Sequence, residues 1–171
     1  MACRGWYTGL LPDEADAFLA ASDVQDRVEL LNSFYLAADQ DGRIQTVDKS
    51  WDAMHRILSG GWLDFEHGDE VLKACVIGGR QLSERNTWIM SYAGPNLVKR
   101  VSDAITDLSR DWFRSQYFAL HTNPPGLFVF RYEVDLDEQD FEYTWDYFTM
   151  VRDFYGRMAE RGLANVFAAD Q

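Results

Sequence analysis

Apolar residues recur along the chain at spacings that alternate between those of helices and those of strands. Helical spacing, bounded by capping residues or proline, predicts helices from Pro12, from Ser22 or Asp23, over about 49–59, at 70–77, from Pro95, over about 111–120 and over about 136–161. Stretches rich in aromatic and β-branched residues predict strands over 2–11, around 44–47, and over 87–92, 127–132 and 163–168, the last at a sheet edge. The pattern predicts an α+β fold, mostly helical with a small sheet, with a long C-terminal helix packed in the core.

Glycines mark the places where this pattern changes. The pairs Gly60-Gly61 and Gly78-Gly79 follow helical segments and are typical of helix ends. Gly5 and Gly9 lie inside the first predicted strand, where we expect kinks or close backbone approaches. No internal repeat and no linker rich in Pro, Gly or Ser divides the chain, so we expect residues 1–171 to form a single domain.

Composition and charge narrow the possible partners and locations. The 171 residues include 16 Lys+Arg and 28 Asp+Glu, which gives a formal net charge of −12. Such a negative field repels phosphate, which argues against binding to nucleic acid or to an anionic membrane. No apolar run approaches the roughly 20 residues needed to cross a bilayer, and no signal-peptide pattern opens the sequence. We therefore expect a cytoplasmic protein.

Neither the cysteines nor the histidines form a recognised metal or redox motif. Cys3 and Cys75 are far apart and not in a CxxC arrangement, and His55, His67 and His121 lack paired ligand spacing. The glycine pairs also lack the flanking residues of a phosphate-binding loop. We expect no metal and no cofactor.

The strongest compositional bias lies before and within the last predicted helix. Between Arg131 and Arg152 there is no basic residue, and seven acidic residues alternate with aromatic ones. One interpretation is a core helix whose acidic residues lie at its positive N-terminal end. The other is a negative surface that binds a basic protein, with Asp137, Glu138 and Asp140 as the binding residues.

A second dense segment surrounds His55. If it is helical, Asp48 and Asp52 lie near His55 along one face, and a carboxylate one turn away would orient the imidazole for acid–base catalysis, with Lys49 holding an anion. The plainer interpretation is that Asp48 or Ser50 caps the helix, Trp51 anchors it in the core or contributes to binding, and His55 is a core histidine with satisfied hydrogen bonds.

Several of these segments together resemble a known family. They are the opening run from Met1 to Tyr7, the run Val47 to His55 that leads to Gly60-Gly61, the run Ala74 to Gly79, and the aromatic helix from Phe141 to Arg161. They are similar to the YfbM-like family of small bacterial proteins, a domain of unknown function. The sequence departs from the family pattern at about 85–93 and 124–134. The resemblance implies a single α+β domain of bacterial or phage origin and carries over no activity.

Three classes of function remain open on the sequence. The first is a non-catalytic binding or regulatory protein, for example one of the immunity type that blocks a partner. The second is a hydrolase or transferase for a small ligand, using His55 with Asp48 or Asp52. The third is a structural component of a larger assembly, in which Trp and Tyr anchor interfaces. The sequence does not decide whether the protein is an enzyme, or whether it is a monomer or a small homo-oligomer.

Overall fold

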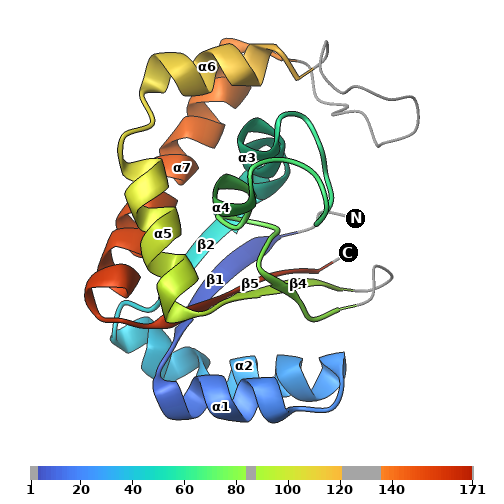
Figure 1. The fold of residues 1–171 in the computed structure, drawn as a ribbon, viewed down its shortest axis with the longest axis vertical. Helices are drawn as coiled ribbons and strands as arrows, with labels where there is room; N and C mark the ends of the chain where they lie inside the picture. Colours follow the sequence, from blue (N-terminus) through green and yellow to red (C-terminus); the bar gives the residue numbers. More distant parts are fainter. Residues whose placement is uncertain (1–3, 84–87, 121–135, 171) are drawn as a thin grey trace.

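The computed structural model describes residues 4–83, 88–120 and 136–170. Within them, a five-stranded antiparallel sheet separates two layers of helices (Figure 1). The predicted α+β fold, mostly helical with a small sheet and a long C-terminal helix in the core, is confirmed. None of the helices in these ranges is long and apolar enough to cross a membrane.

The sheet has the strand order β2-β1-β5-β4-β3. Its strands are β1 (Gly5–Leu10), β2 (Ile44–Asp48), β3 (Arg80–Gln81), β4 (Trp88–Ala93) and β5 (Ala164–Asp170). The prediction that the C-terminal strand lies at an edge is wrong, because β5 pairs with β1 on one side and with β4 on the other. Its residues from Ala164 to Ala169 are all buried, as expected for a central strand covered on both faces.

Helices α1 (Pro12–Ala20) and α2 (Val24–Gln40) cover one face of the sheet, and the remaining helices lie on the other side (Figure 1). These are α3 (Ser50–Ser59), α4 (Glu70–Lys73), α5 (Pro95–Thr106), α6 (Arg110–Phe118) and α7 (Glu138–Glu160). The helix expected over 70–77 ends at Lys73, because a series of turns follows before Gly78. The strand expected over 127–132 lies outside the described residues.

The cores on the two faces differ in size. The larger core lies between the sheet and α3 to α7, where Tyr7, Phe148, Phe154 and Phe167 are fully or almost fully buried. The smaller one lies under α1 and α2 and is formed mainly by aliphatic side chains around Phe18. Of helix α2 itself, only Leu31 and Ala38 are buried.

The glycines of β1 permit the close packing of the larger core. A Cβ atom on Gly9 would lie 2.2 Å from the Sδ atom of Met158, and one on Gly5 would lie 2.7 Å from the indole of Trp51. Both distances are far below normal contact, so the helices α7 and α3 approach the strand closely only because these positions carry no side chain.

Candidate functional site

His55 lies in the core, and both of its ring nitrogens have backbone partners. Its Nε2 atom lies 3.0 Å from the carbonyl oxygen of Asp64, and its Nδ1 atom accepts the backbone N–H of Ile77 at 3.3 Å. This pairing requires a neutral ring that donates from Nε2 and accepts at Nδ1. Complete burial lowers the pKa of His55 to about 4, which holds the ring in that neutral form at physiological pH.

The other residues predicted around His55 do not converge on its imidazole. Asp52 is paired with the Nε atom of Arg56 one turn along α3, and Lys49 extends from an exposed position at the helix start. Trp51 is almost fully buried and packs its ring 5.8 Å from that of Phe167. The side chains of this segment are therefore distributed between the core and separate surface positions.

Asp48 ends β2 with an unusual backbone conformation. Its φ of +44° lies in the left-handed region, which few residues other than glycine adopt, although aspartate is among those that do. The Tyr143 hydroxyl donates to its Oδ2 atom at 3.1 Å, and the Nε atom of Arg4 lies 3.6 Å from its Oδ1 atom. Burial, together with the neighbouring carboxylate, raises the pKa of Tyr143 to about 12, so its hydroxyl remains a donor.

The acidic residues predicted to bind a basic partner contact groups of this chain. Asp137 caps α7 by accepting the N–H of Asp140, and the carboxylate of Asp140 accepts the hydroxyl of Tyr117. Glu138 forms an ion pair with Arg114 of α6. These contacts attach α6 to the start of α7 and partly offset the negative charge there.

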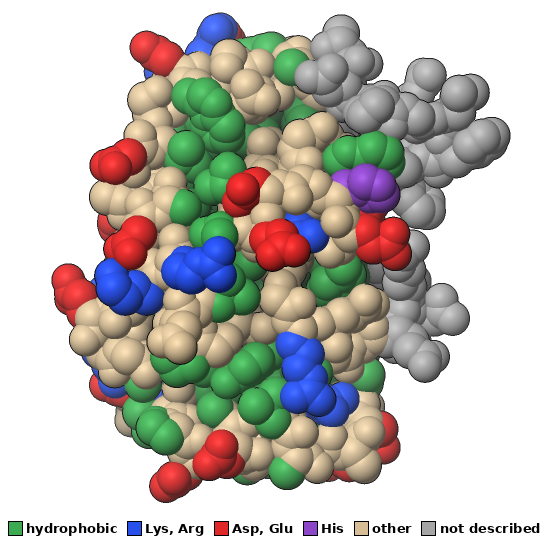
Figure 2. Space-filling model, viewed as in Figure 1, with side chains coloured by type: hydrophobic (Ala, Val, Ile, Leu, Met, Phe, Trp, Pro, Cys, Tyr) green, Lys and Arg blue, Asp and Glu red, His purple; other side chains and the backbone are tan. Residues whose placement is uncertain are grey.

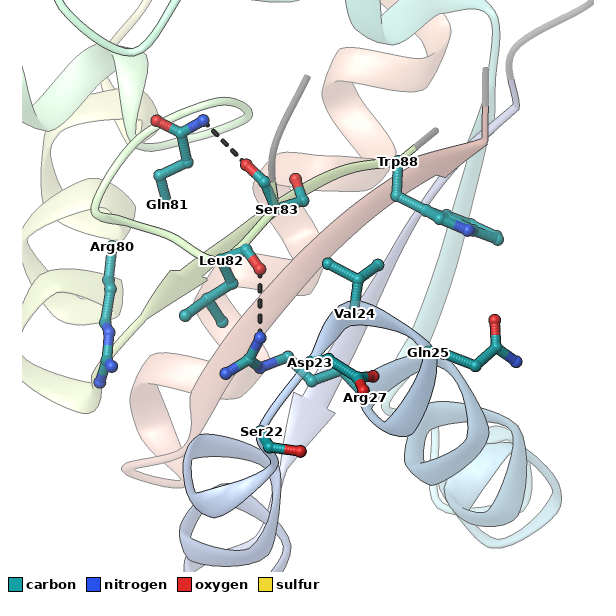
Figure 3. A pocket seen from close by; sticks show the side chains of 10 residues that line it. All are labelled: Ser22, Asp23, Val24, Gln25, Arg27, Arg80, Gln81, Leu82, Ser83 and Trp88. Carbon is teal, nitrogen blue, oxygen red and sulfur yellow. Dashed lines mark hydrogen bonds between the residues drawn. The ribbon is translucent and has the colours of Figure 1, made fainter. Parts of the chain in front are cut away.

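A larger concavity lies instead on the α1–α2 side of the sheet, among the described residues, and has a volume of about 1040 Å³. We call it the α2 cavity. It is lined by residues 22–25 and Arg27 at the start of α2, by residues 80–83 around β3, and by Trp88 at the start of β4 (Figure 3). The volume is sufficient for an organic ligand of ordinary size.

Local hydrogen bonds hold the walls of the α2 cavity in place. Asp23 caps α2 by accepting the N–H of Asp26 at 2.9 Å. One turn later, Arg27 donates to the carbonyl oxygen of Ala21 at 2.7 Å. It also donates to the carbonyl oxygen of Leu82 at 3.2 Å (Figure 3). Arg27 thus links the α1–α2 connection to the segment after β3, and its guanidinium lies at the centre of the cavity wall.

A second, smaller cavity lies near the start of β1 and has a volume of about 520 Å³. We call it the Asp48 cavity. It is lined by residues 4–6, by three residues of α2 including Tyr35, by Thr46 and Asp48 of β2, and by Asp170 of β5. Trp6 of this cavity packs edge-to-face on Trp88 of the α2 cavity, with ring centroids 5.6 Å apart. One indole of each cavity therefore contacts the other.

Among the described residues, neither cavity is lined by a histidine or a cysteine. In the α2 cavity, the Ser22 hydroxyl donates to the carboxylate of Asp26, and the Ser83 hydroxyl accepts the N–H of Met90. Cys75 is buried in the larger core, where burial raises the pKa of its thiol. Within the part of the chain that the structure describes, no group of three or more metal-ligating side chains could hold a metal ion.

Comparison with known proteins places this fold in a family. Residues 1–168 match the family described as a domain of unknown function, DUF1877. The chain belongs to this family. Among solved structures, it is similar to a protein of unknown function, YfbM from Escherichia coli, with a TM-score of 0.68 and 18% sequence identity over 97% of this chain and 99% of that one. No curated protein matches the sequence. The YfbM-like resemblance is thereby confirmed, and at this identity the structural likeness shows the fold alone.

The residues of the α2 cavity in this DUF1877 domain were not among those predicted from the sequence. Arg27, Arg80 and Trp88 come from three separate segments and form no motif. No spacing in the sequence links these three positions, because the fold brings their segments together.

Proposed function

We propose that this DUF1877 domain is a non-catalytic binding protein whose ligand occupies the α2 cavity. The observation that carries the proposal is that the α2 cavity lies away from the side chains with catalytic chemistry, His55 and Cys75. The α2 cavity offers guanidinium, amide, hydroxyl and indole groups, which bind and orient ligands. The imidazole of His55 and the thiol of Cys75 are instead buried in the larger core, on the other side of the sheet.

The alternative function, a hydrolase or transferase that uses His55 with Asp48 or Asp52, has weaker support. An acid–base catalyst must come within hydrogen-bond distance of its substrate and titrate near the working pH. The ring nitrogens of His55 already contact backbone groups, and its pKa is lowered to about 4. A structural role for His55, holding the loop after α3 against the segment before β3, accounts for both observations.

A non-catalytic binding protein could also bind a basic protein partner, with a regulatory or immunity-like role, and we keep both as proposals. Asp137, Glu138 and Asp140 support them less than the α2 cavity supports a ligand, because their carboxylates contact α6 and the start of α7. Acidic and basic side chains are also interspersed on the face shown in Figure 2. Weakening of a complex by reversal of the exposed charge at Glu138, with a reduced salt dependence, would support the basic partner.

The proposed function is tested by screening a chemically diverse set of small molecules for thermal stabilisation of the protein. We expect ligands whose effect is lost in Trp88→Ala and kept in Trp62→Ala, which alters a half-buried indole on the opposite side of the sheet. Mass spectrometry of the recovered ligands should show them unchanged. Chemical conversion of a ligand, stabilisation that does not depend on Trp88, or a screen without ligands would contradict the proposal.

A further inference from the structure

We propose that the ligand of the α2 cavity carries an anionic group, a carboxylate or a phosphate, next to an aromatic or apolar body. This inference rests on the proposed binding function and specifies the chemistry of the ligand. It starts from two arginines, Arg27 of α2 and Arg80 of β3, which line the same cavity (Figure 3).

Arginines elsewhere in this acidic protein are mostly paired with carboxylates. The paired arginines are Arg4, Arg43, Arg56, Arg110, Arg114 and Arg161. In the described part of the chain, neither Arg27 nor Arg80 forms an ion pair. Arg100, Arg152 and Arg157 also form no ion pair among the described residues, but Arg27 and Arg80 are two such arginines that line one cavity, on a chain with 28 acidic residues to 16 basic ones.

Arg27 retains binding capacity after its structural contacts are made. Its two terminal nitrogens donate to the carbonyls of Ala21 and Leu82, which fix the guanidinium without neutralising its charge. Its Nε atom is buried and has no hydrogen-bond partner in the structure. The two carbonyl oxygens and the enclosed Nε leave the guanidinium charge without a carboxylate, and an anionic group in the cavity would compensate that charge.

Arg80 supplies a second positive charge from β3. It lies on β3 and is exposed, and no hydrogen bond involves its guanidinium among the described contacts. Asp23 also lines the cavity, but one of its carboxylate oxygens is engaged in capping α2. Figure 2 shows basic side chains at the height between the sheet and the α1–α2 layer. The lining therefore carries a net positive charge on a protein whose overall charge is negative.

The remaining walls indicate that the ligand is larger than an inorganic ion. The apolar surface of the cavity is formed by Val24, Leu82 and the indole of Trp88, and in Figure 3 Trp88 and Arg80 lie at opposite ends of the group. A volume of about 1040 Å³ exceeds the needs of a phosphate ion alone. A ligand with a flat apolar body would pack that body on the indole and direct its anionic group toward the arginines, and so contact both ends of the cavity.

The test compares three probes that share one aromatic body: 1-naphthoate, 1-naphthyl phosphate and 1-naphthamide. Their affinities for the full-length protein are measured by isothermal titration calorimetry at low salt. We expect at least one anionic probe to bind at least about tenfold more tightly than the neutral amide, since charged hydrogen bonds are among the strong ones. Comparison of naphthoate with naphthyl phosphate distinguishes the two anionic groups.

Variants locate the effect at the cavity. Arg80→Gln should weaken binding of the anionic probe by about tenfold to a hundredfold and leave the amide unaffected, and Arg80→Lys should recover part of the loss. Arg100→Gln is the matched control, because it removes the same charge from an exposed position on α5, across the sheet. It should change the affinity less than about twofold.

The outcomes separate this inference from the proposed function. If the amide binds as tightly as the anionic probes and its binding depends on Trp88, the cavity binds ligands but the inference about charge is wrong. If Arg100→Gln weakens binding as much as Arg80→Gln, the attraction is a general property of the surface and the inference is also wrong. If no probe binds at millimolar concentration, the inference is contradicted, while the small-molecule screen still tests the proposed function.

Discussion

Acidification should destabilise this protein through His55, and the structure gives the size of the effect. The imidazole is fully buried and its pKa is lowered to about 4, from an ordinary value of 6.5. Between these values, the unfolded chain binds a proton that the native state does not bind. Stability conferred by the neutral ring is therefore present above pH 6.5 and is lost as the pH falls toward 4.

The magnitude follows from the two pKa values. At pH 7 the unfolded imidazole is mostly neutral, whereas at pH 5 it is almost entirely protonated and the native ring is still neutral. Lowering the pH from 7 to 5 should therefore reduce the free energy of unfolding by about 2 kcal/mol through His55 alone. The limit far below pH 4 is about 3 kcal/mol.

The assay is urea unfolding at pH 7, 6 and 5 of the wild-type protein and of His55→Gln, which cannot titrate but can still donate and accept hydrogen bonds. We expect the variant to be less stable at pH 7 and to lose about 2 kcal/mol less than the wild type between pH 7 and pH 5. Ile57→Val, a buried change on the same helix, is the control and should lower stability by about 1 kcal/mol equally at both pH values. Equal pH dependence in the wild type and His55→Gln, or an NMR titration of His55 near pH 6.5, would refute the reasoning.

Further predictions concern the close approach in β1 and the buried thiol. Gly9→Ala should destabilise the protein by about 1–3 kcal/mol, because the new methyl group would displace the buried side chain of Met158, whereas Gly156→Ala in α7 meets no neighbour and should stabilise it by about 0.5–1 kcal/mol. Thermal or urea unfolding compares the two, and a stable Gly9→Ala would contradict the packing described here. In a Cys3→Ser background, Cys75 should resist thiol reagents in the native protein and react once urea unfolds it, because burial raises its pKa. Rapid modification without unfolding would show that the thiol is accessible.

The elements of the fold were largely predictable because their signals are local. Asp23 caps α2 and Gly60 ends α3 in a left-handed conformation, as the sequence pattern indicated. The position of β5 was not predictable in this way, because strand order depends on which distant segments pair. The small apolar residues of β5, buried on both faces, are compatible with a central strand but do not require one.

The candidate site was less predictable, for physical reasons that differ between residues. The partners of His55 are backbone groups of Asp64 and Ile77, which leave no trace in the identity of the residues that carry them. The α2 cavity combines Arg27, Arg80 and Trp88 from segments that only the sheet brings together. Sequence spacing encodes contacts within one helix or strand, and it carries no record of a cavity formed between them.

The central claim is that this DUF1877 domain binds a ligand in the α2 cavity and does not transform it. The most direct test is to record two-dimensional NMR spectra of the backbone amides and tryptophan indoles while titrating a ligand found by the thermal screen. We predict that the largest shifts occur at Trp88, Arg80 and the first turn of α2, with the ligand signals unchanged over days. Shifts centred on His55 and the loop after α3, or the appearance of product signals, would contradict the account.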